Sequence, residues 1–389
     1  MPLKPLQIHE ILESKREDFT AFDRKTLGYL EKYRSALTDL TDSSVAKLQA
    51  ELTDFPKDFG AQPLEPLLSA SSYVIPSKLS WKSREQSLTW VRDRLMGIKT
   101  FAVDGSQIFP GKDLSIPIAL VQVGWFENPH LPSGDYEKNV DLDVMTPSDL
   151  RVNSSGEPAD RRVNFRRFQM ETDRLVQYIQ DHAERQDCLV FFDGSLVGTF
   201  AEAFEPELRR EYTHCFLRLL RASQDCRVPL VGYVDTTYAR DLTVMLQQAF
   251  SLPECRPIHD AQLVHKFMEW GDRTPLARCR RGGILQDYEE QRDQIAFTYM
   301  KTTREGYPAR IEMPVWMYEA GLLNRVMDWV RGEVIIGSGY PYVIETADQT
   351  AVLQADDRQA FFRILQDWAE REELNLRFSR KMVSKTRRR

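Results

Sequence analysis

The sequence contains little cysteine: five of 389 residues, which are Cys188, Cys215, Cys226, Cys255 and Cys279. They are scattered and form no CxxC pair, so they indicate neither a disulfide framework nor a zinc site. Unpaired cysteines are typical of a reducing interior, and we expect a cytoplasmic protein. No apolar run approaches the roughly 18 residues of a membrane span, and the first ten residues lack the apolar centre of a signal peptide, so we expect no membrane partner.

Positive charge is not in excess either, because 52 Lys and Arg residues stand against 58 Asp and Glu residues, a net charge of −6. This argues against a chain that coats nucleic acid through bulk positive charge, although a local basic surface or a divalent metal can still attract phosphate. A glycine-rich phosphate loop is also missing, since "GSGYPY" does not fit GxxxxGK[ST]. Any ATP-driven step would therefore need a partner. The six histidines form no HExxH motif, and only His259 and His265 are candidates for lining a DNA path.

The spacing of the apolar residues predicts helices at the beginning of the chain, followed by a body in which strands and helices alternate. Residues 1–95 predict a helical arm that packs on the body or on a second copy of the chain. The predicted strands are 101–106, 116–127, 188–194, 229–235 and 294–302, and the predicted helices are 164–186, 205–223, 239–250, one beginning near 319, and 356–372, with a polar connection at 128–160 and a loop at 337–353. This alternation predicts an α/β domain over 96–376 with a partly parallel sheet, followed by a basic tail at 377–389.

Two of the predicted strands end in the same three residues. "VDGS" contains Asp104 and "FFDGSL" contains Asp193. A buried apolar strand delivers its last residue to the edge of the sheet, where ligands of α/β folds collect, so the two carboxylates can meet in one site. Carboxylate oxygens suit Mn²⁺ or Mg²⁺, and two such ions roughly 4 Å apart can activate a water for phosphodiester cleavage. The alternative is that each Asp-Gly is only a turn.

A third acidic ligand is usually needed for such a site, and Glu171 is the candidate. It shares a helical face with Phe168 and Leu175, at i, i+3 and i+7. An acidic side chain on an apolar face needs a partner, which a metal would provide. The alternative partner is an arginine, Arg167 or Arg174.

The order "VDGS", a helical Glu, "FFDGSL" and a late "GYP…AD" resembles the NurA nuclease family, over roughly Phe101 to Leu353. The resemblance implies an RNase H-like mixed sheet flanked by helices, here with an N-terminal helical arm and C-terminal helical additions. It also implies a manganese-dependent nuclease that degrades DNA 5′ to 3′ and cuts single strands, using one or two Mn²⁺ or Mg²⁺ ions. Such nucleases act in DNA end resection and repair as dimers joined to HerA, a hexameric DNA-translocating ATPase.

Carried over from the family, the catalytic residues are Asp104, Glu171, Asp193 and Tyr340, with Tyr340 positioning a phosphate or ordering the attacking water. One position departs from the archaeal pattern, which has His after Ala eight positions beyond this Tyr. Here Asp348 stands in that place. Asp is itself an oxygen ligand for Mn²⁺ or Mg²⁺, so we count it as a metal ligand, although it cannot carry a proton as imidazole does.

Other polar residues are candidates for contacts outside the metal site. Asp235 ends a predicted strand and is either a fourth carboxylate or the N-cap of the following helix, and we favour the cap. Ser106, Ser195, Tyr340 and Arg387 are candidates for DNA contact. The tail carries seven basic residues and no acidic one, which suits phosphate or an acidic partner, or simply solvent. Alternative functions are a non-catalytic scaffold that holds DNA for an ATPase, and a nuclease of the same fold that acts on RNA.

Overall fold

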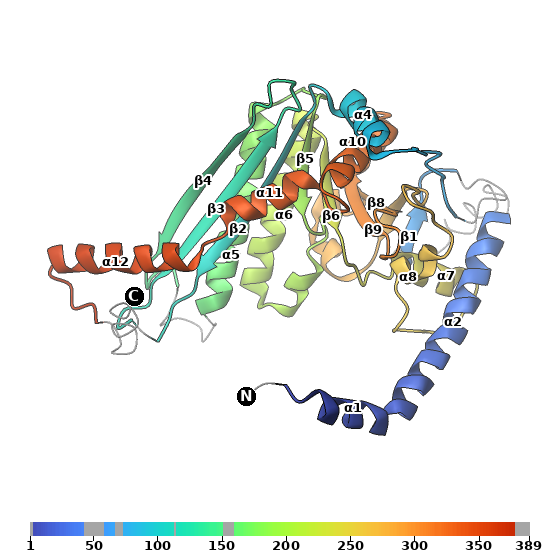
Figure 1. The fold of residues 1–389 in the computed structure, drawn as a ribbon, viewed down its shortest axis with the longest axis horizontal. Helices are drawn as coiled ribbons and strands as arrows, with labels where there is room; N and C mark the ends of the chain where they lie inside the picture. The colour runs from blue at the N-terminus through green and yellow to red at the C-terminus, as the bar shows by residue number, and fades with distance from the viewer. Residues whose placement is uncertain (1–2, 43–57, 67–72, 113, 151–158, 378–389) are drawn as a thin grey trace. The chain divides into compact units, whose positions relative to one another are not determined.

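The computed structural model describes residues 3–42, 58–66, 73–112, 114–150 and 159–377 (Figure 1). The chain divides into two compact units. The first consists of Met1–Ser80, Val234–Gly282 and Asp293–Ile311, and the second of Trp81–Tyr233, Gly283–Arg292 and Glu312–Arg389. The strands form a nine-stranded sheet in the order β1-β7-β8-β9-β6-β5-β2-β3-β4. The boundaries predicted from the sequence, at residues 95 and 376, stay predictions.

The second unit contains the strands that carry the Asp-Gly-Ser elements. Its strands are β2 (Lys99–Ile108), β3 (Ala119–Asn128), β4 (Glu137–Met145), β5 (Cys188–Asp193) and most of β6 (Leu230–Val234). β2, β3 and β4 pair antiparallel, whereas β5 pairs parallel with β2 on one side and with β6 on the other. Three antiparallel strands followed by parallel ones confirm the predicted RNase H-like mixed sheet.

Helices cover both faces of these strands. They are α4 (Arg84–Leu95), α5 (Ala159–Asp181), α6 (Pro206–Cys226), α9 (Val315–Glu319), α10 (Leu323–Ile336), α11 (Tyr342–Ala351) and α12 (Ala355–Arg371), with 3₁₀ turns at Thr199–Ala203, Gly283–Asp287 and Glu289–Gln291. Figure 1 shows α11 across one face of β2 and β3, with α5 and α6 behind them. No helix in the described part of the chain is long and apolar enough to cross a membrane.

The core of this unit follows from the apolar runs of the sequence. All side chains of β5 before Asp193 are buried, because a strand covered on both faces must be apolar throughout. The helix α5 adds a stacked pair, Phe101 against Tyr178, with ring centroids 3.8 Å apart. Cys188 and Cys215 are buried here, and all five cysteines of the chain are free thiols. The core therefore fixes the end of β5, where Asp193 stands.

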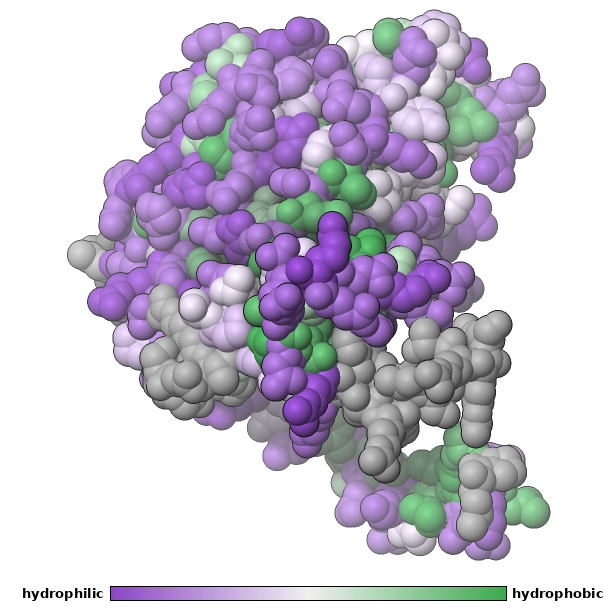
Figure 2. Space-filling model, turned by 90° about the vertical axis from the view of Figure 1, so that its left-hand side faces the viewer, coloured by the Kyte–Doolittle hydropathy of each residue, from purple (hydrophilic) through white to green (hydrophobic). Residues whose placement is uncertain are grey.

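The first unit joins the N-terminal helices to a small set of strands. Its elements are α1 (Pro5–Ser14), α2 (Arg16–Asp42), β1 (Gly60–Pro63), α7 (Asp241–Ala249), α8 (Asp260–His265), β7 (Ala277–Arg280), β8 (Ile295–Met300) and part of β9 (Ala309–Pro314). The end of α2 is buried, and its Tyr33 hydroxyl donates to the Pro253 carbonyl over 2.9 Å. In contrast, apolar side chains such as Leu6, Phe19 and Phe22 remain exposed on α1 and early α2. Figure 2 shows hydrophobic residues as separate green groups on a mostly hydrophilic face of the molecule.

Several sequence expectations are corrected by the structure. The segment 337–353, expected as a loop, contains the helix α11, which begins directly after Pro341, a residue well suited to a helix start. The segment 128–160, expected as a polar connection, contains β4, whose side chains are almost all exposed. Such an edge strand carries charges along its length and lacks the apolar run of a buried strand. The short strands β1 and β7 and the strand β9 were not expected either.

Candidate active site

The ends of β2 and β5 bring Asp104 and Asp193 together. These strands pair parallel, with Ala102 opposite Phe191, so the two aspartates stand at matching positions two residues further on. Adjacent strands lie about 4.8 Å apart, and each Asp follows a buried apolar run. The paired Asp-Gly-Ser elements are thus neighbours in space at one edge of the sheet.

Glu171 reaches the same place from α5. It is buried, as its position between Phe168 and Leu175 on the inner helical face requires. Its Oε1 lies 2.5 Å from Nη1 of Arg167, one helical turn earlier, and the same guanidinium nitrogen is 4.0 Å from Oδ1 of Asp104. The arginine pairing that the sequence left open is therefore present.

Two glycines make this close approach of helices and strands feasible. A Cβ atom on Gly105 would clash with Oε1 of Glu171 and lie 2.6 Å from Cγ of Arg167, so a larger residue would displace these two side chains. A Cβ on Gly124 would lie 2.7 Å from the backbone nitrogen of Ala351 at the end of α11. Asp104 and Gly124 are register partners on β2 and β3, so α11 crosses the sheet directly beside the first aspartate.

The position of α11 places Asp348 and Tyr340 at the site. The buried carboxylate of Glu333 on α10 accepts a 2.9 Å hydrogen bond from the backbone nitrogen of Val343 in the first turn of α11. Asp348 lies in the interior of this helix, so its side chain does not cap a helix or turn the chain. Just before the helix, the Tyr340 hydroxyl donates a 2.9 Å hydrogen bond to Oδ1 of Asp193. The Tyr340 ring also packs edge-on against Tyr233, the register partner of Asp193 on β6.

The carboxyl groups perturb one another electrostatically. Burial raises the pKa of Asp104 to about 6; donation from the Gly105 backbone opposes the rise, and the carboxyls of Asp348 and Asp193 add to it. Burial also raises the pKa of Glu171 to about 8, which the Arg167 charge opposes and the Asp104 and Asp193 charges support. Ionised carboxylates so close together need a cation.

The donor set fits a hard divalent cation, because all four groups offer carboxylate oxygens, and the raised pKa values of Asp104 and Glu171 show a shortage of positive charge. Across the described residues, however, no three His, Cys, Asp or Glu side chains already stand in a geometry that could hold an ion. The Arg167 guanidinium lies against Glu171 where a cation would be needed. Binding an ion therefore requires this side chain to shift.

The two serines of the Asp-Gly-Ser elements have internal partners. Ser195 Oγ donates over 2.9 Å to Oε2 of Glu312, and the same carboxylate oxygen accepts from the backbone nitrogen of Leu196 over 2.6 Å. Ser106 Oγ accepts a 3.3 Å hydrogen bond from the backbone nitrogen of Leu353. Their contact with DNA stays a prediction. Arg387 lies outside the described residues.

Asp235 is not the N-cap that we favoured. The helix α7 begins at Asp241 with Arg240 in the cap position, and Asp235 is an exposed residue whose Oδ2 accepts a 3.4 Å hydrogen bond from Thr236. A turn of several residues separates the strand from the helix, which the sequence pattern did not reveal. His259 and His265 lie in the first unit, at the beginning and end of α8.

Sequence reasoning missed two residues that hold the site together. Glu312 and Glu333 are both fully buried. Glu312 accepts a hydrogen bond from the turn after Asp193, and Glu333 accepts one from the start of α11. A signal existed for Glu312, because a single acidic residue in the apolar run "ARIEMP" needs a buried partner. Glu333 gave a weaker signal, since it sits in an amphipathic helix where Glu is common.

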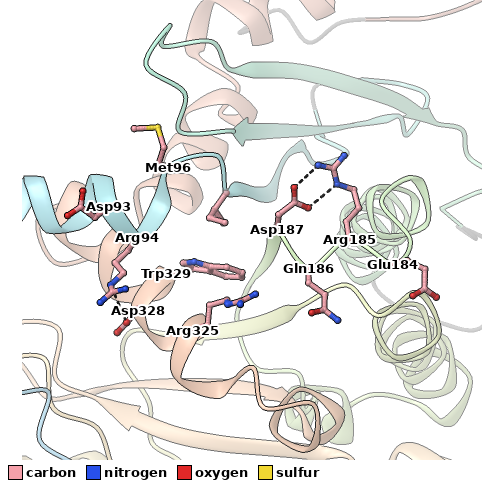
Figure 3. Close-up of a pocket in the computed structure, with 11 residues that line it drawn as sticks. Asp93, Arg94, Met96, Glu184, Arg185, Gln186, Asp187, Arg325, Asp328 and Trp329 are labelled. Atoms are coloured by element: carbon pink, nitrogen blue, oxygen red, sulfur yellow. Dashed lines mark hydrogen bonds and ion pairs between the residues drawn. The ribbon is translucent and has the colours of Figure 1, made fainter.

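A cavity lies at the opposite end of β2 and β5 from the two aspartates. Its volume is about 770 Å³, and its lining includes Ile98 and Asp187, which directly precede β2 and β5. Figure 3 shows the Arg325 side chain beside the Trp329 ring toward the middle of the cavity, while Arg185 and Asp187 pair with each other. The acidic cluster and this cavity are therefore separate features of the second unit.

The profile of the NurA domain matches residues 98–353, well over half of the 389-residue chain. The chain belongs to the NurA family. The match covers every element that contributes to the acidic cluster, from β2 to α11. A search of curated proteins finds no match. The family assignment and the cluster of carboxylates together support a nuclease.

Solved structures similar to this NurA-family chain include NurA itself. A crystal structure of NurA has a TM-score of 0.43 and 10% identity, covering 72% of this chain and 93% of that one. A crystal structure of NurA with manganese has a TM-score of 0.40 and 10% identity, covering 75% and 94%. The catalytic domain of human endonuclease V has a TM-score of 0.32 and 14% identity, covering 76% and 92%.

Proposed function

We propose that this NurA-family protein is a divalent-metal-dependent nuclease that hydrolyses phosphodiester bonds of DNA. The observation that carries the proposal is the matching position of Asp104 and Asp193 on adjacent parallel strands. Glu171 and Asp348 lie near enough to take part in the mutual electrostatic perturbation of this cluster. Four carboxyl groups held together at a sheet edge suit the cleavage of a phosphate diester. The substrate is negatively charged, so cations must hold it beside these carboxylates.

The side chains of the site have different roles. Asp104, Glu171, Asp193 and Asp348 would hold one or two Mn²⁺ or Mg²⁺ ions. When bound, such ions supply an activated water for in-line attack on phosphorus and offset the charge on the leaving oxygen. Tyr340 fixes the orientation of Asp193 through its hydroxyl and leaves its ring at the edge of the site, where a phosphate or water would be positioned.

Arg167 gives the site its resting form. Its guanidinium donates a hydrogen bond to the carboxyl group of Glu171 in the absence of another cation. When it moves away from Glu171, it carries a positive charge suited to a phosphate oxygen of the substrate. The reaction needs no covalent intermediate, because water itself is the nucleophile that displaces the leaving oxygen from phosphorus.

The direct test is to incubate the purified protein with end-labelled DNA and RNA, in Mn²⁺ or in EDTA. We expect DNA cleavage with Mn²⁺ and none with EDTA. Asp104→Asn and Asp193→Asn should each abolish cleavage while the fold is kept, because the amide has the same shape without the charge. Asp225→Asn, at an exposed carboxylate near the end of α6, is the matched control and should cleave like the wild type. Near-normal cleavage by either site variant would refute the assignment, and cleavage of RNA alone would identify an RNA-directed enzyme.

The finer activity that we propose is 5′ to 3′ exonuclease and single-strand endonuclease action in DNA end resection and repair. Support comes from membership of the NurA family, for which the resemblance implies these activities. Substrates labelled at the 5′ or the 3′ end distinguish the two polarities, because a 5′ to 3′ enzyme releases the 5′ label at once. Closed circular single strands detect the endonuclease activity separately.

We propose further that the protein is a cytoplasmic homodimer that docks on a HerA-type hexameric ATPase. The exposed apolar side chains of α1 and α2 support association, because exposed apolar patches mark interaction surfaces. The missing nucleotide loop supports a separate motor. Light scattering that shows only a 45.2 kDa monomer at micromolar concentration, with no complex on addition of the ATPase, would count against both associations. The five free cysteines support the cytoplasmic location.

A further inference from the structure

Two tyrosines of the first unit are exposed and yet fixed in place. Tyr238 has 78% and Tyr307 has 51% of its surface exposed. Both rings pack nearly perpendicular on the largely buried imidazole of His259, with centroid distances of 5.4 Å and 5.6 Å. The Tyr307 ring also contacts His265, at 5.2 Å. Aromatic rings held in this way can stack on a ligand with little loss of conformational freedom.

Positive charge lies beneath these rings. The buried Nζ atom of Lys301 is 2.8 Å from Nδ1 of His265 and also donates to the carbonyl of Gly306. Arg34 donates over 3.0 Å to the carbonyl of Gln262 in α8. Within the described part of the chain, no carboxylate lies at ion-pairing distance from Lys301 or Arg34. Both cations donate hydrogen bonds to neutral acceptors, while the carboxylates of Glu269 and Glu31 act on their charges from beyond ion-pairing distance, so both can still attract an anion.

The hydrogen bond from Lys301 fixes the tautomer of His265. An ammonium group can only donate, so Nδ1 of the imidazole accepts and the ring proton is on Nε2. Burial, and then the charges of Lys301 and Arg34, lower the pKa of His265, and burial lowers the pKa of His259. Nε2–H of His265 is therefore a neutral donor next to the Tyr307 ring, in the half-exposed part of the cluster.

We propose that Tyr238 and Tyr307, fixed on His259, form a stacking site for the bases of single-stranded DNA, whose phosphates are attracted by Lys301 and Arg34. The combination points to a nucleic-acid strand, because its bases offer flat aromatic faces and its backbone offers repeated negative charges. A duplex keeps its bases stacked on one another and offers no free face. The proposal rests on the proposed nuclease function and adds a substrate-holding site to it.

The test measures strand binding without cleavage. The full-length protein is titrated in EDTA against a fluorescein-labelled oligodeoxythymidylate, and fluorescence anisotropy reports binding. Because base stacking on an aromatic side chain is worth about 1–3 kcal/mol, Tyr238→Ala and Tyr307→Ala should each weaken binding by roughly tenfold. Tyr238→Phe and Tyr307→Phe should bind like the wild type, since they keep the ring. Tyr136→Ala, at a tyrosine that is 60% exposed in the second unit, is the matched control and should also bind normally.

An abasic strand of equal length separates stacking from phosphate attraction. The wild type should bind it as weakly as the double alanine variant binds the thymidylate strand. Equal affinity of the wild type and the double alanine variant for the thymidylate strand would overturn the stacking site, as would full affinity for the abasic strand. Cleavage assays in Mn²⁺ keep the two proposals apart. If the wild type cleaves DNA while the alanine variants bind the strand normally, the stacking site is refuted and the nuclease function stands.

Discussion

The Tyr340 hydroxyl donates a 2.9 Å hydrogen bond to Oδ1 of Asp193 across 147 residues of sequence. This contact joins the connection before α11 to the end of β5. Because Asp348 lies on α11, this connection links the position of the Asp348 carboxylate to the orientation of the Asp193 carboxylate. The ring of Tyr340 is in turn held edge-on by Tyr233 on the neighbouring strand. The site is thus braced from the sheet and from the C-terminal helices together.

Tyr340→Phe tests the contribution of this hydroxyl. The variant keeps the ring on Tyr233 and loses only the hydrogen bond to Asp193. Hydrogen bonds to charged groups are worth about 1.5–3 kcal/mol, so we expect cleavage to slow by roughly 10- to 100-fold, with only a small loss of thermal stability because this bond is exposed. Single-turnover cleavage rates and melting temperatures give the two readouts. An unaltered rate would show that the hydroxyl neither orients Asp193 nor contacts the substrate.

Glu312→Ala tests the brace beneath the second Asp-Gly-Ser element. Removal of this buried carboxylate leaves the Leu196 backbone nitrogen without its 2.6 Å partner and opens a cavity in β9. A buried donor left unsatisfied costs about 1–3 kcal/mol, so the free energy of unfolding should fall by at least that amount. Glu312→Gln keeps an oxygen acceptor and should lose less. Urea denaturation measures both, and equal stability of the Ala variant and the wild type would contradict the role.

Much of the site could be read from the sequence because it depends on local patterns. The apolar runs before Asp104 and Asp193 specify buried strands, and the i, i+3, i+7 spacing around Glu171 specifies which helical face is buried. These patterns result directly from the periods of strands and helices. Strand pairing then places the two aspartates side by side without further information.

The remaining features depend on contacts between distant segments. The exposed edge strand β4 has no apolar face, and β1 and β7 contain four residues each, too few for a periodic signal. Pro341 suits a helix start as well as a turn, so α11 could not be told from a loop. Arg167 and not Arg174 pairs with Glu171, because the Arg174 guanidinium packs over the rings of Phe101 and Trp125 instead.

The raised carboxyl pKa values predict how metal binding depends on pH. Without a cation, Asp104 with a pKa of about 6 and Glu171 with a pKa of about 8 hold protons in the folded state that an ordinary carboxyl has already lost. Stability of the metal-free protein should therefore decline as pH rises from about 4 to 8, because the unfolded chain ionises these groups freely. Metal must displace the protons, so Mn²⁺ should bind more tightly at pH 8 than at pH 6.

Isothermal titration with Mn²⁺ at several pH values measures this effect directly. Glu171→Gln should bind Mn²⁺ more weakly and show a shallower pH dependence above pH 6, where the wild type still loses the Glu171 proton. An equally steep dependence in this variant would assign the proton release to other groups. The control is Asp225→Asn, on α6, whose titration should match the wild type.

Asp348 decides how this chain completes a site in which archaeal relatives are expected to carry His. As a metal ligand it contributes one oxygen and one charge, so Asp348→Ala should weaken Mn²⁺ binding, slow cleavage, and recover in part at higher metal concentration. Asp348→His should retain more activity than the Ala variant, because imidazole also ligates Mn²⁺. Asp348→Asn removes the charge and should shift the metal curve nearly as far as Ala does. Titration of Mn²⁺ against cleavage rate compares the four proteins, and an Asn variant with an unshifted curve would remove Asp348 from the site.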